Sequence, residues 1–341
     1  MRVLIIKLSS IGDVVHTLPA LYALRKGLEK TGARAEIDWL VEEPASAILL
    51  GHPLIDNVIV VKDRGWTRDI KGNMKAARFL AGRGYDMALD FQGLLKSSVW
   101  VHLSRGGRKI GFSNSRELSP AFLNEKLPPY DPDRHAVDRY LDLARYAGGI
   151  SKEAVFDLNI TPQDKARAEG ILKKNGITPG ITPFFVIVPM ARWKTKLWSA
   201  EKFVEAAKAV IKDGMKAVLA GGPDDKKRLD EMRENIGNGA VNLAGSGSLK
   251  DFAAIVRSAG FAVTVDSGPM HIAAAAGVRT VALFGPTAPW RTGPYGEGHI
   301  IVRKGLSCSP CFKKRCGNVR CMDKITVDDV LRAVKELKAG C

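Results

Sequence analysis

An aspartate lies near the start of the chain, where an apolar strand gives way to a helix. In MRVLIIKLSSIGDVVHTLPAL the strand leads into Lys7, Ser9, Ser10, Gly12 and Asp13, and apolar residues then resume at helical spacing. A carboxylate at this junction could act as a general base, a group that must lie within hydrogen-bond reach of the proton it removes. It could also cap the helix, a common role for aspartate before an apolar helix. The residues alone favour the cap.

A second junction, FAVTVDSGPMHIAAAAGVRTVALFGPTAPW at 261–290, holds more polar groups. A strand ends at Asp266, a turn of small residues follows, and His271 lies early in the next helix. Free N–H groups and the helix dipole make such a turn an anion site. A second glycine turn at 284–287 could grip the same nucleotide-sugar diphosphate. Alternatively, Asp266 caps the helix and His271 is an ordinary buried histidine. We favour a binding site because several polar groups converge on one turn.

A basic loop follows another strand end, in VIVPMARWKTKLWSAEKF at 186–203. Arg192, Lys194 and Lys196 could neutralise a phosphate there, or they could be solvated loop residues. Ser199 is expected to cap the next helix without a capping box, because a lysine occupies the position that needs Glu or Gln.

A third strand end carries two acids, in AVLAGGPDDKK at 217–227. Asp224 could take a ribose hydroxyl pair, as acids do in nucleotide-binding folds, and capping of the helix near Asp225 explains the pair equally well. The chain has no GxGxxG after its first strand and no GxxxxGK[ST] motif, so a standard dinucleotide or P-loop site is unsupported.

Four cysteines lie close together in CSPCFKKRCGNVRC, and a fifth, Cys341, is terminal and is assigned no role. The four are Cys308, Cys311, Cys316 and Cys321. Four thiolates at this spacing could hold a structural zinc ion or an iron–sulfur cluster, and the alternative is a loop of reduced thiols. Zinc is the metal that we expect, in a structural role only.

Composition and charge narrow the class of protein. Of the 341 residues, 45% are hydrophobic and 26% charged, which is ordinary for a globular protein. We find neither an apolar run long enough to span a membrane nor a signal peptide, so we expect a cytoplasmic protein. The net charge of +16 indicates an anionic partner or simply a solvated surface. Residues 62–116 alone hold twelve Lys/Arg and four Asp.

Of the possible anionic partners, nucleic acid is the one that we expect least. Single-strand binding would need exposed aromatic side chains among the basic residues of 62–116. Most aromatic residues there lie in apolar strand or helix patterns, which predicts that they belong to the core.

Short apolar runs alternate with helical patterns along the whole chain, which is typical of parallel α/β sheets. The pattern restarts after GITPGITPFF, whose glycines and prolines indicate a linker. We therefore predict two doubly wound α/β domains, 1–176 and 177–341, with the cysteine cluster at 308–321 and a final helix in the second. Ligands of such sheets bind beyond the carboxyl ends of the strands, and the cleft between the domains is the expected site. Strands are predicted at 2–7, 36–41, 57–61, 86–91, 108–112, 184–189, 216–220, 240–244, 261–266, 279–284 and 299–303.

Several segments, in this order, resemble the ADP-heptose:lipopolysaccharide heptosyltransferases, glycosyltransferase family 9. They are KLSSIGDVVHTLPAL at 7–21, YDMALDFQGLLKS at 85–97, KLW at 196–198, and VDSGPMHIAAAAG with LFGPT at 265–287. The first two are most similar to the type I enzyme, which adds heptose to the Kdo of Kdo-lipid A. The cysteine cluster departs from the enterobacterial pattern.

The resemblance implies a fold, a reaction and site residues. The fold is two Rossmann-like domains of the GT-B architecture, with the acceptor bound by the N-terminal domain and the ADP-sugar by the C-terminal domain. The reaction is inverting transfer from ADP-L-glycero-D-manno-heptose in lipopolysaccharide inner-core biosynthesis, with no catalytic metal. The catalytic aspartate falls on Asp13 and the phosphate-binding lysine on Lys196. The donor-binding candidates are Ser10, Gly12, Arg192, Asp224, Asp266, Ser267, Gly268, Met270 and His271.

The acceptor implied by the resemblance gives the basic residues a partner. Kdo carries a carboxylate and lipid A carries phosphates, and the candidates to hold them are Arg64, Arg68, Lys71, Lys96 and Arg116. The same face could dock on the anionic inner membrane, so we expect a peripheral association there and no nucleic-acid partner. The alternative function is heptosyltransferase II or a related transferase acting on a later core sugar.

Overall fold

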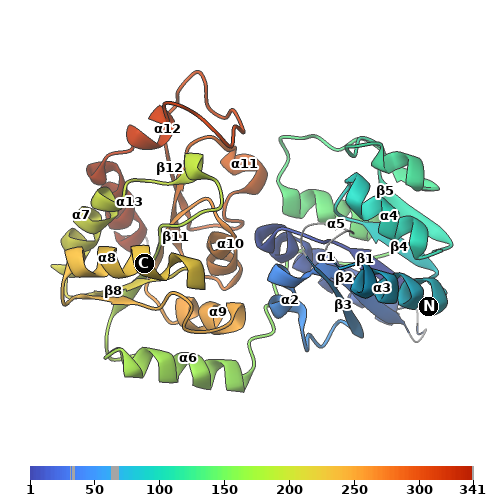
Figure 1. The fold of residues 1–341 in the computed structure, drawn as a ribbon, viewed down its shortest axis with the longest axis horizontal. Helices are drawn as coiled ribbons and strands as arrows, with labels where there is room; N and C mark the ends of the chain where they lie inside the picture. The colour runs from blue at the N-terminus through green and yellow to red at the C-terminus, as the bar shows by residue number, and fades with distance from the viewer. Residues whose placement is uncertain (31, 33–34, 63–68, 340–341) are drawn as a thin grey trace. The chain divides into compact units, whose positions relative to one another are not determined.

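A computed structural model describes residues 1–30, 32, 35–62 and 69–339. It divides into two compact units, Met1–Asn159 and Ile160–Cys341. Each unit is built around one parallel sheet of six strands with helices along it (Figure 1). This confirms the predicted fold class, and within the described ranges no helix combines the length and apolar character needed to cross a bilayer.

Unit 1 contains a sheet in the spatial order β3-β2-β1-β4-β5-β6. Its strands are β1 (Arg2–Ile6), β2 (Glu36–Glu42), β3 (Asn57–Val61), β4 (Met87–Asp90), β5 (Arg108–Phe112) and β6 (Glu125–Leu127). Its helices are α1 (Ile11–Lys30), α2 (Glu43–Leu49), α3 (Ile70–Arg83), α4 (Leu95–Leu103), η1 (Ser119–Phe122) and α5 (Ala136–Tyr146). β6 was not predicted, because this short edge strand buries a single residue and has no apolar run.

Unit 2 repeats this topology, in the order β12-β11-β10-β7-β8-β9. Its strands are β7 (Phe184–Val188), β8 (Lys216–Leu219), β9 (Ala240–Asn242), β10 (Ala262–Val265), β11 (Thr280–Phe284) and β12 (Ile300–Arg303). Its helices are α6 (Pro162–Lys174), η2 (Lys194–Lys196), α7 (Ala200–Ile211), η3 (Pro223–Asp225), α8 (Lys226–Ile236), α9 (Leu249–Arg257), α10 (Gly268–Ala275), α11 (Pro289–Thr292), α12 (Arg320–Asp323) and α13 (Val327–Ala339).

The unit boundary lies before α6 rather than at residue 176. Ala168 and Leu172 of α6 pack into the same core cluster as Phe184 and Val186 of β7. The glycine- and proline-rich stretch at 176–183 is therefore a turn inside unit 2, and its composition indicates the turn and not a domain linker.

Apolar side chains hold the helices of unit 1 against its sheet. Ala76 and Leu80 of α3, with Trp100 of α4, pack on Leu4 and Ile6 of β1. Among the aromatic residues of the basic segment, Tyr85, Phe91, Trp100 and Phe112 are buried, as predicted, while Phe79 is exposed.

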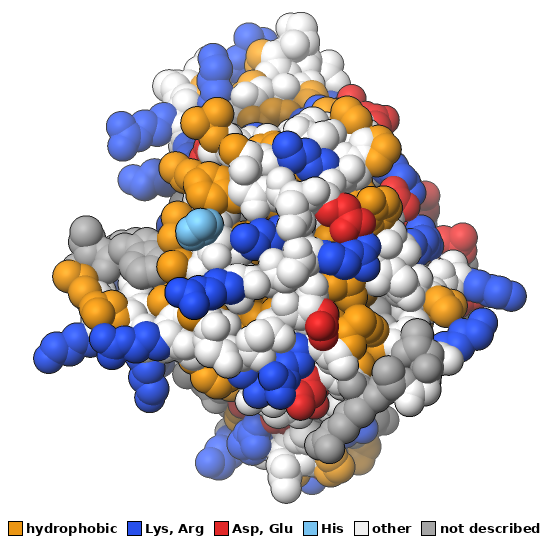
Figure 2. Space-filling model, turned by 90° about the vertical axis from the view of Figure 1, so that its right-hand side faces the viewer, with side chains coloured by type: hydrophobic (Ala, Val, Ile, Leu, Met, Phe, Trp, Pro, Cys, Tyr) orange, Lys and Arg blue, Asp and Glu red, His pale blue; other side chains and the backbone are white. Residues whose placement is uncertain are grey.

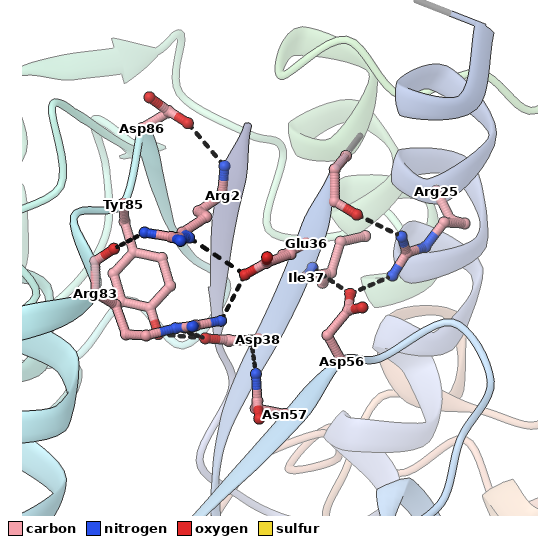
Figure 3. A network of polar contacts seen from close by, with 11 residues as sticks. Arg2, Arg25, Glu36, Ile37, Asp38, Asp56, Asn57, Arg83, Tyr85 and Asp86 are labelled. Atoms are coloured by element: carbon pink, nitrogen blue, oxygen red, sulfur yellow. Dashed lines mark hydrogen bonds and ion pairs between the residues drawn. The ribbon is translucent and has the colours of Figure 1, made fainter. Parts of the chain in front are cut away.

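A polar network closes the amino-terminal edge of the unit 1 sheet (Figure 3). Arg83, at the end of α3, lies 3.1 Å from Asp38 and 2.7 Å from Glu36, and Tyr85 donates to Asp38 at 2.6 Å. Burial, with Asp38 alongside, raises the pKa of Tyr85, so its hydroxyl stays protonated as a donor. These charges are paired with one another, which leaves the opposite, carboxyl edge as the place for ligand chemistry.

Candidate functional site

Both units have a strand order that reverses beside their first strand. In unit 1 the reversal lies between β1 and β4, and in unit 2 between β7 and β10. Doubly wound sheets bind ligands beyond the carboxyl ends of the strands at this switch point. The loops after these four strands carry Asp13, Gln92, Lys196 and Asp266, so each unit brings its polar candidates to one place.

Asp13 lies in the first turn of α1 and is partly exposed. Its Oδ2 accepts hydrogen bonds from the Ser10 backbone N–H at 2.8 Å and from Ser10 Oγ at 2.9 Å. Its Oδ1 lies 4.0 Å from Lys7 Nζ, and 36% of the side chain remains accessible to solvent. Asp13 is therefore the third residue of α1 and bonds back to Ser10, which precedes the helix, so it is not the N-cap that the residues alone favoured. Its carboxylate is still partly exposed to solvent.

Lys7 is buried directly behind Asp13, with 2% of its surface exposed. Its Nζ donates to the Phe91 carbonyl at 2.9 Å and to the Tyr140 hydroxyl at 2.6 Å. Burial opposes the charge, but the electrostatic effects of Tyr140 and Asp13 outweigh it and raise the pKa of Lys7. The lysine is thus a fixed cation beside the candidate base.

The loop after β4 fixes the loop after β1. Gln92 Oε1 accepts from the backbone N–H groups of both Leu8 and Ser9, each at 3.1 Å. Buried Asp90 holds Gln92 in turn, since its Oδ1 accepts from the Gln92 N–H at 3.0 Å. Burial is the main cause that raises the pKa of Asp90.

Lys96, an acceptor candidate, also reaches this edge. Its Nζ donates to Ser9 Oγ at 2.8 Å and to Glu42 Oε1 at 2.7 Å. Ser10 is exposed beside it, and Gly12 is buried in the helix start. Unit 1 therefore gathers Ser10, Gly12, Asp13 and Lys96 at one loop.

The switch point of unit 2 holds a compact ionic group. Lys196 Nζ lies 2.6 Å from Asp266 Oδ2, and Thr287 Oγ1 donates to the same oxygen at 2.6 Å. The Asp266 side chain is 5% exposed and that of Lys196 is 17% exposed. The carboxylate therefore anchors the lysine from inside, and the lysine side chain stays partly exposed.

The start of α10 adds backbone donors and small residues. Ser267 occupies the N-cap position and makes no side-chain cap, so Asp266 is not the helix cap. Gly268 begins the helix, and His271 is buried within it. Met270 requires a correction: its side chain has no exposed surface and packs in a core cluster with β11, so it is not available to a ligand.

The remaining donor candidates lie at the surface of unit 2. Arg192 is exposed on the loop after β7. Asp225 Oδ2 accepts from the Gly222 N–H at 2.9 Å and so fixes the turn after β8, while Asp224 is left exposed.

Ser199 accepts from the Lys202 N–H at 3.3 Å, which confirms the predicted simple cap of α7.

The acceptor candidates are less concentrated. Arg64 and Arg68 lie outside the described residues. Lys71 is exposed on α3, and Arg116 is exposed while its backbone N–H donates to the Gly93 carbonyl at 3.1 Å. Of the described acceptor candidates, only Lys96 contacts the loop that leads into α1, through Ser9.

The cysteine loop is hydrogen-bonded to two segments beside the lysine–aspartate group, at Thr195 and Pro286. The Cys311 N–H donates to the Pro286 carbonyl at 3.0 Å, and Thr195 Oγ1 donates to the Lys313 carbonyl at 2.9 Å. Burial, then the charges of Cys311 and Cys308, raise the pKa of the Cys321 thiol. In the part of the chain that the structure covers, no three His, Cys, Asp or Glu side chains are grouped closely enough to hold a metal ion, so zinc stays a prediction.

Three residues at these sites were missed by the sequence reasoning. Lys7, Gln92 and Thr287 all stand inside the quoted family segments, at or just after the ends of buried strands. A polar residue that directly follows a buried strand is a usable signal, because the carboxyl edge is where such sheets bind ligands.

Comparison with known proteins agrees with this geometry. Residues 74–321 match the family model described as glycosyltransferase family 9 (heptosyltransferase). Lipopolysaccharide heptosyltransferase 1 of Pseudomonas aeruginosa is 31% identical over 331 residues, which cover 93% of this chain and 87% of the relative. The protein of the same name from Escherichia coli K12 is 32% identical, with coverage of 89% and 93%.

Solved structures give the same result. A crystal structure of a family 9 glycosyl transferase from Veillonella parvula superposes with a TM-score of 0.84 at 24% identity, covering 100% of this chain and 97% of that one. The structure described as E. coli heptosyltransferase WaaC with ADP has a TM-score of 0.78 at 28% identity, with 99% and 100% covered. The chain belongs to glycosyltransferase family 9, the heptosyltransferases, and is a glycosyltransferase of the GT-B fold.

Proposed function

We propose that this chain transfers heptose from ADP-L-glycero-D-manno-heptose to the Kdo of Kdo-lipid A, in lipopolysaccharide inner-core biosynthesis. Curated relatives named lipopolysaccharide heptosyltransferase 1 support this reading. Two solved E. coli relatives carry ADP and ADP-2-deoxy-2-fluoro heptose. The observation that carries the proposal is the Lys196–Asp266–Thr287 group at the switch point of unit 2, because it presents an anchored cation where a diphosphate would bind.

Asp13 is the general base in this proposal. A hydroxyl of Kdo attacks the anomeric carbon of the donor, and Asp13 takes the hydroxyl proton as the new glycosidic bond forms. The bond between the anomeric carbon and the diphosphate oxygen breaks, and ADP leaves. A positioned base of this kind is worth roughly 10²–10⁴-fold in rate. The two Ser10 hydrogen bonds hold Asp13 Oδ2, and Oδ1 lies 4.0 Å from Lys7 Nζ.

Lys196 stabilises the negative charge that develops on the departing ADP. A preorganised cation does this without reorganisation at the moment of reaction. Asp266 and Thr287 fix its position, and the N–H groups at the start of α10 add donors. One base and no nucleophilic carboxylate imply a single displacement with inversion, and the lysine supplies charge stabilisation without a catalytic metal.

The acceptor is a membrane lipid, so we propose a peripheral association with the inner membrane. Lys96 donates to Ser9 in the loop before α1, and we assign it to a carboxylate of Kdo. Basic side chains are spread over the face shown in Figure 2 and outnumber the acidic ones among them. Such a face is attracted to anionic headgroups and to lipid A phosphates.

The test separates the base from the cap. Asp13→Asn keeps an oxygen that can accept from Ser10, but an amide cannot take the proton. We expect a folded Asp13→Asn to lose at least about 10²-fold in transfer to Kdo-lipid A. The matched control Glu29→Gln changes an exposed acid at the other end of α1 and should keep full activity. Retention of activity by Asp13→Asn would reduce Asp13 to a cap, and wild-type activity only on a heptosylated acceptor would move the chain to a later step.

We also propose, from the cysteine spacing, that the loop binds one structural zinc ion. Cys308 and Cys311 lie near enough to Cys321 to raise the pKa of its thiol, while Cys316 is exposed, so binding requires the Cys316 segment to move inward. Elemental analysis should find about one zinc per chain, lost on Cys316→Ser. A fully active, metal-free chain would contradict this.

A further inference from the structure

α3 has an unusual charge composition for an exposed helix. Its fourteen residues, IKGNMKAARFLAGR, contain Lys71, Lys75, Arg78 and Arg83 and no acidic residue. Surface helices of soluble proteins usually mix both signs of charge on their outer face, which stabilises the helix through pairs one turn apart. Among the described residues, Arg83 alone of the α3 cations has acidic partners, in the network at the sheet edge. The outer face of α3 is therefore a concentrated positive surface.

Large apolar side chains are also exposed on α3. Ile70 is 58% exposed, Met74 is 44% exposed and Phe79 is 40% exposed. They are not needed to hold the helix in place, because Ala76 and Leu80 on the inner side already pack into the unit 1 core. Exposed apolar groups that gather on one element indicate an interaction surface.

The apolar and basic residues lie in adjacent stripes. Ile70 and Met74 are four residues apart, so they are neighbours along one side of the helix. Lys71, Lys75 and Arg78, which are four and three residues apart, lie together on the adjoining side. A helix with apolar residues beside a band of Lys and Arg is the pattern of helices that lie flat in a membrane interface.

We infer that α3 is a membrane-docking helix, which lies on an anionic phospholipid bilayer with Ile70 and Met74 among the acyl chains near the headgroups and Lys75 and Arg78 on lipid phosphates. The basic side chains complement anionic lipid headgroups, and the apolar stripe fits the acyl chains beneath them, so both features favour an anionic bilayer as the partner. A nucleic acid would use the basic side chains but gains little from exposed aliphatic ones, and four of the aromatic residues nearby in the sequence are buried. A bilayer satisfies both stripes at once.

This inference rests on the proposed function for its purpose, because a lipid acceptor must be found in a membrane plane. Docking restricts the enzyme to the surface where the acceptor is concentrated. It needs no spanning helix, and the described residues contain none. The association should be reversible and salt-dependent, as expected of a single amphipathic helix with a few basic residues.

The test is co-sedimentation of the full chain with vesicles of phosphatidylglycerol and phosphatidylethanolamine, free of lipid A, against vesicles of phosphatidylcholine. We expect binding to the anionic vesicles only. Lys75→Gln/Arg78→Gln should weaken this binding about tenfold, since each basic residue at an anionic surface contributes severalfold. Ile70→Ser/Met74→Ser should remove the part of the binding that survives high salt. The matched control Lys208→Gln/Lys212→Gln removes the same charge from exposed positions at the end of α7 and should bind normally.

The outcomes are separable from those of the proposed function. Transfer to detergent-solubilised Kdo-lipid A is measured on the same samples, and both α3 variants should keep it. Equal vesicle binding by the parent and both α3 variants would overturn the inference, even if transfer is normal. Equal loss in the α7 control would also overturn it, because the effect would then be one of net charge. Tighter binding to an RNA oligonucleotide than to anionic vesicles, abolished by the same variants, would assign the surface to nucleic acid instead.

Discussion

When the pH is lowered, the Lys7→Met variant should begin to lose activity at a higher pH than the parent enzyme does. Lys7 Nζ lies 4.0 Å from Asp13 Oδ1 and is almost completely buried. Methionine is of similar length and uncharged, so the variant removes the cation and keeps most of the volume. An aspartate that loses a neighbouring cation ionises less readily, and its pKa must rise.

The size of the effect follows from the distance and the exposure. Two unit charges at this separation interact by about 4 kcal/mol at an effective dielectric constant near 20. The Asp13 side chain is 36% exposed, so solvent screening reduces this strongly. We take about 1–2 kcal/mol as the surviving interaction, which corresponds to roughly one pKa unit. The acid limb of kcat/KM should therefore move upward by about one pH unit.

The assay is the pH profile of kcat/KM for transfer from ADP-heptose, measured on folded protein. Lys26→Met is the matched control, because Lys26 lies on α1, is exposed and pairs with Glu29 away from Asp13. Its profile should superimpose on that of the parent. Tyr140→Phe gives a second reading, since it removes the hydroxyl that accepts from Lys7 but leaves the ammonium in place. The acid limb of the kcat/KM profile should move less in Tyr140→Phe than in Lys7→Met.

An unchanged limb in Lys7→Met would refute the reasoning. Lys7 would then serve only to satisfy the Phe91 carbonyl and the Tyr140 hydroxyl. A uniform loss at every pH, with no shift, would point to altered packing of the loop rather than to a changed base. Both results differ from the shift that the 4.0 Å separation predicts.

Three further changes test other parts of the chain. Lys196→Met should weaken ADP binding by roughly 10–100-fold in calorimetric titration, because charge-assisted hydrogen bonds contribute about 1.5–3 kcal/mol; an affinity equal to that of Lys194→Met would count against a phosphate role. Burial acts against the charge of Asp329, but Lys304 at 2.6 Å and the hydrogen bonds of Thr326 lower its pKa to about 2, from an ordinary 3.8. The stability it adds is present above the ordinary value and lost as the pH falls toward 2, so Asp329→Asn should unfold about 2 kcal/mol more easily at neutral pH and no differently at pH 2. Gly285→Ala should destabilise the protein by about 1–3 kcal/mol in chemical denaturation, since its new Cβ would lie 2.5 Å from Met322 Sδ; equal stability would show that this methionine can move aside.

The fold could be predicted because its strands are buried on both faces. Parallel strands with helices on each side appear as short continuous apolar runs, and every predicted run is a strand in the structure. The missing strand, Glu125–Leu127, lies at a sheet edge and needs no such run. The boundary between the units was misplaced for a related reason: glycine and proline mark turns, and only packing decides whether a turn separates two cores.

The candidate site was predictable in its residues but not in its contacts. Asp13, Lys196 and Asp266 stood out because charged residues followed strand ends within recognisable segments. The bond between Lys196 and Asp266 joins loops seventy residues apart in the chain, and no local pattern predicts it. Met270 was misassigned for the converse reason, since a residue inside a site segment can point into the core.

The two interpretations of Asp13 also turn out to be compatible. The residues favoured an N-cap and the resemblance implied a base. In the structure Asp13 stabilises the helix start from the third position of α1, and its two carboxylate oxygens have different surroundings. Oδ2 is held by both donors of Ser10, and Oδ1 faces Lys7 while the side chain stays partly exposed. A cap restricts the rotamer of the carboxylate, and a base gains from such a restriction because its geometry is set before the substrate arrives. Aspartate at the start of a helix that follows a buried strand is therefore a sensible place for a base, and the capping hydrogen bonds are part of how it would work.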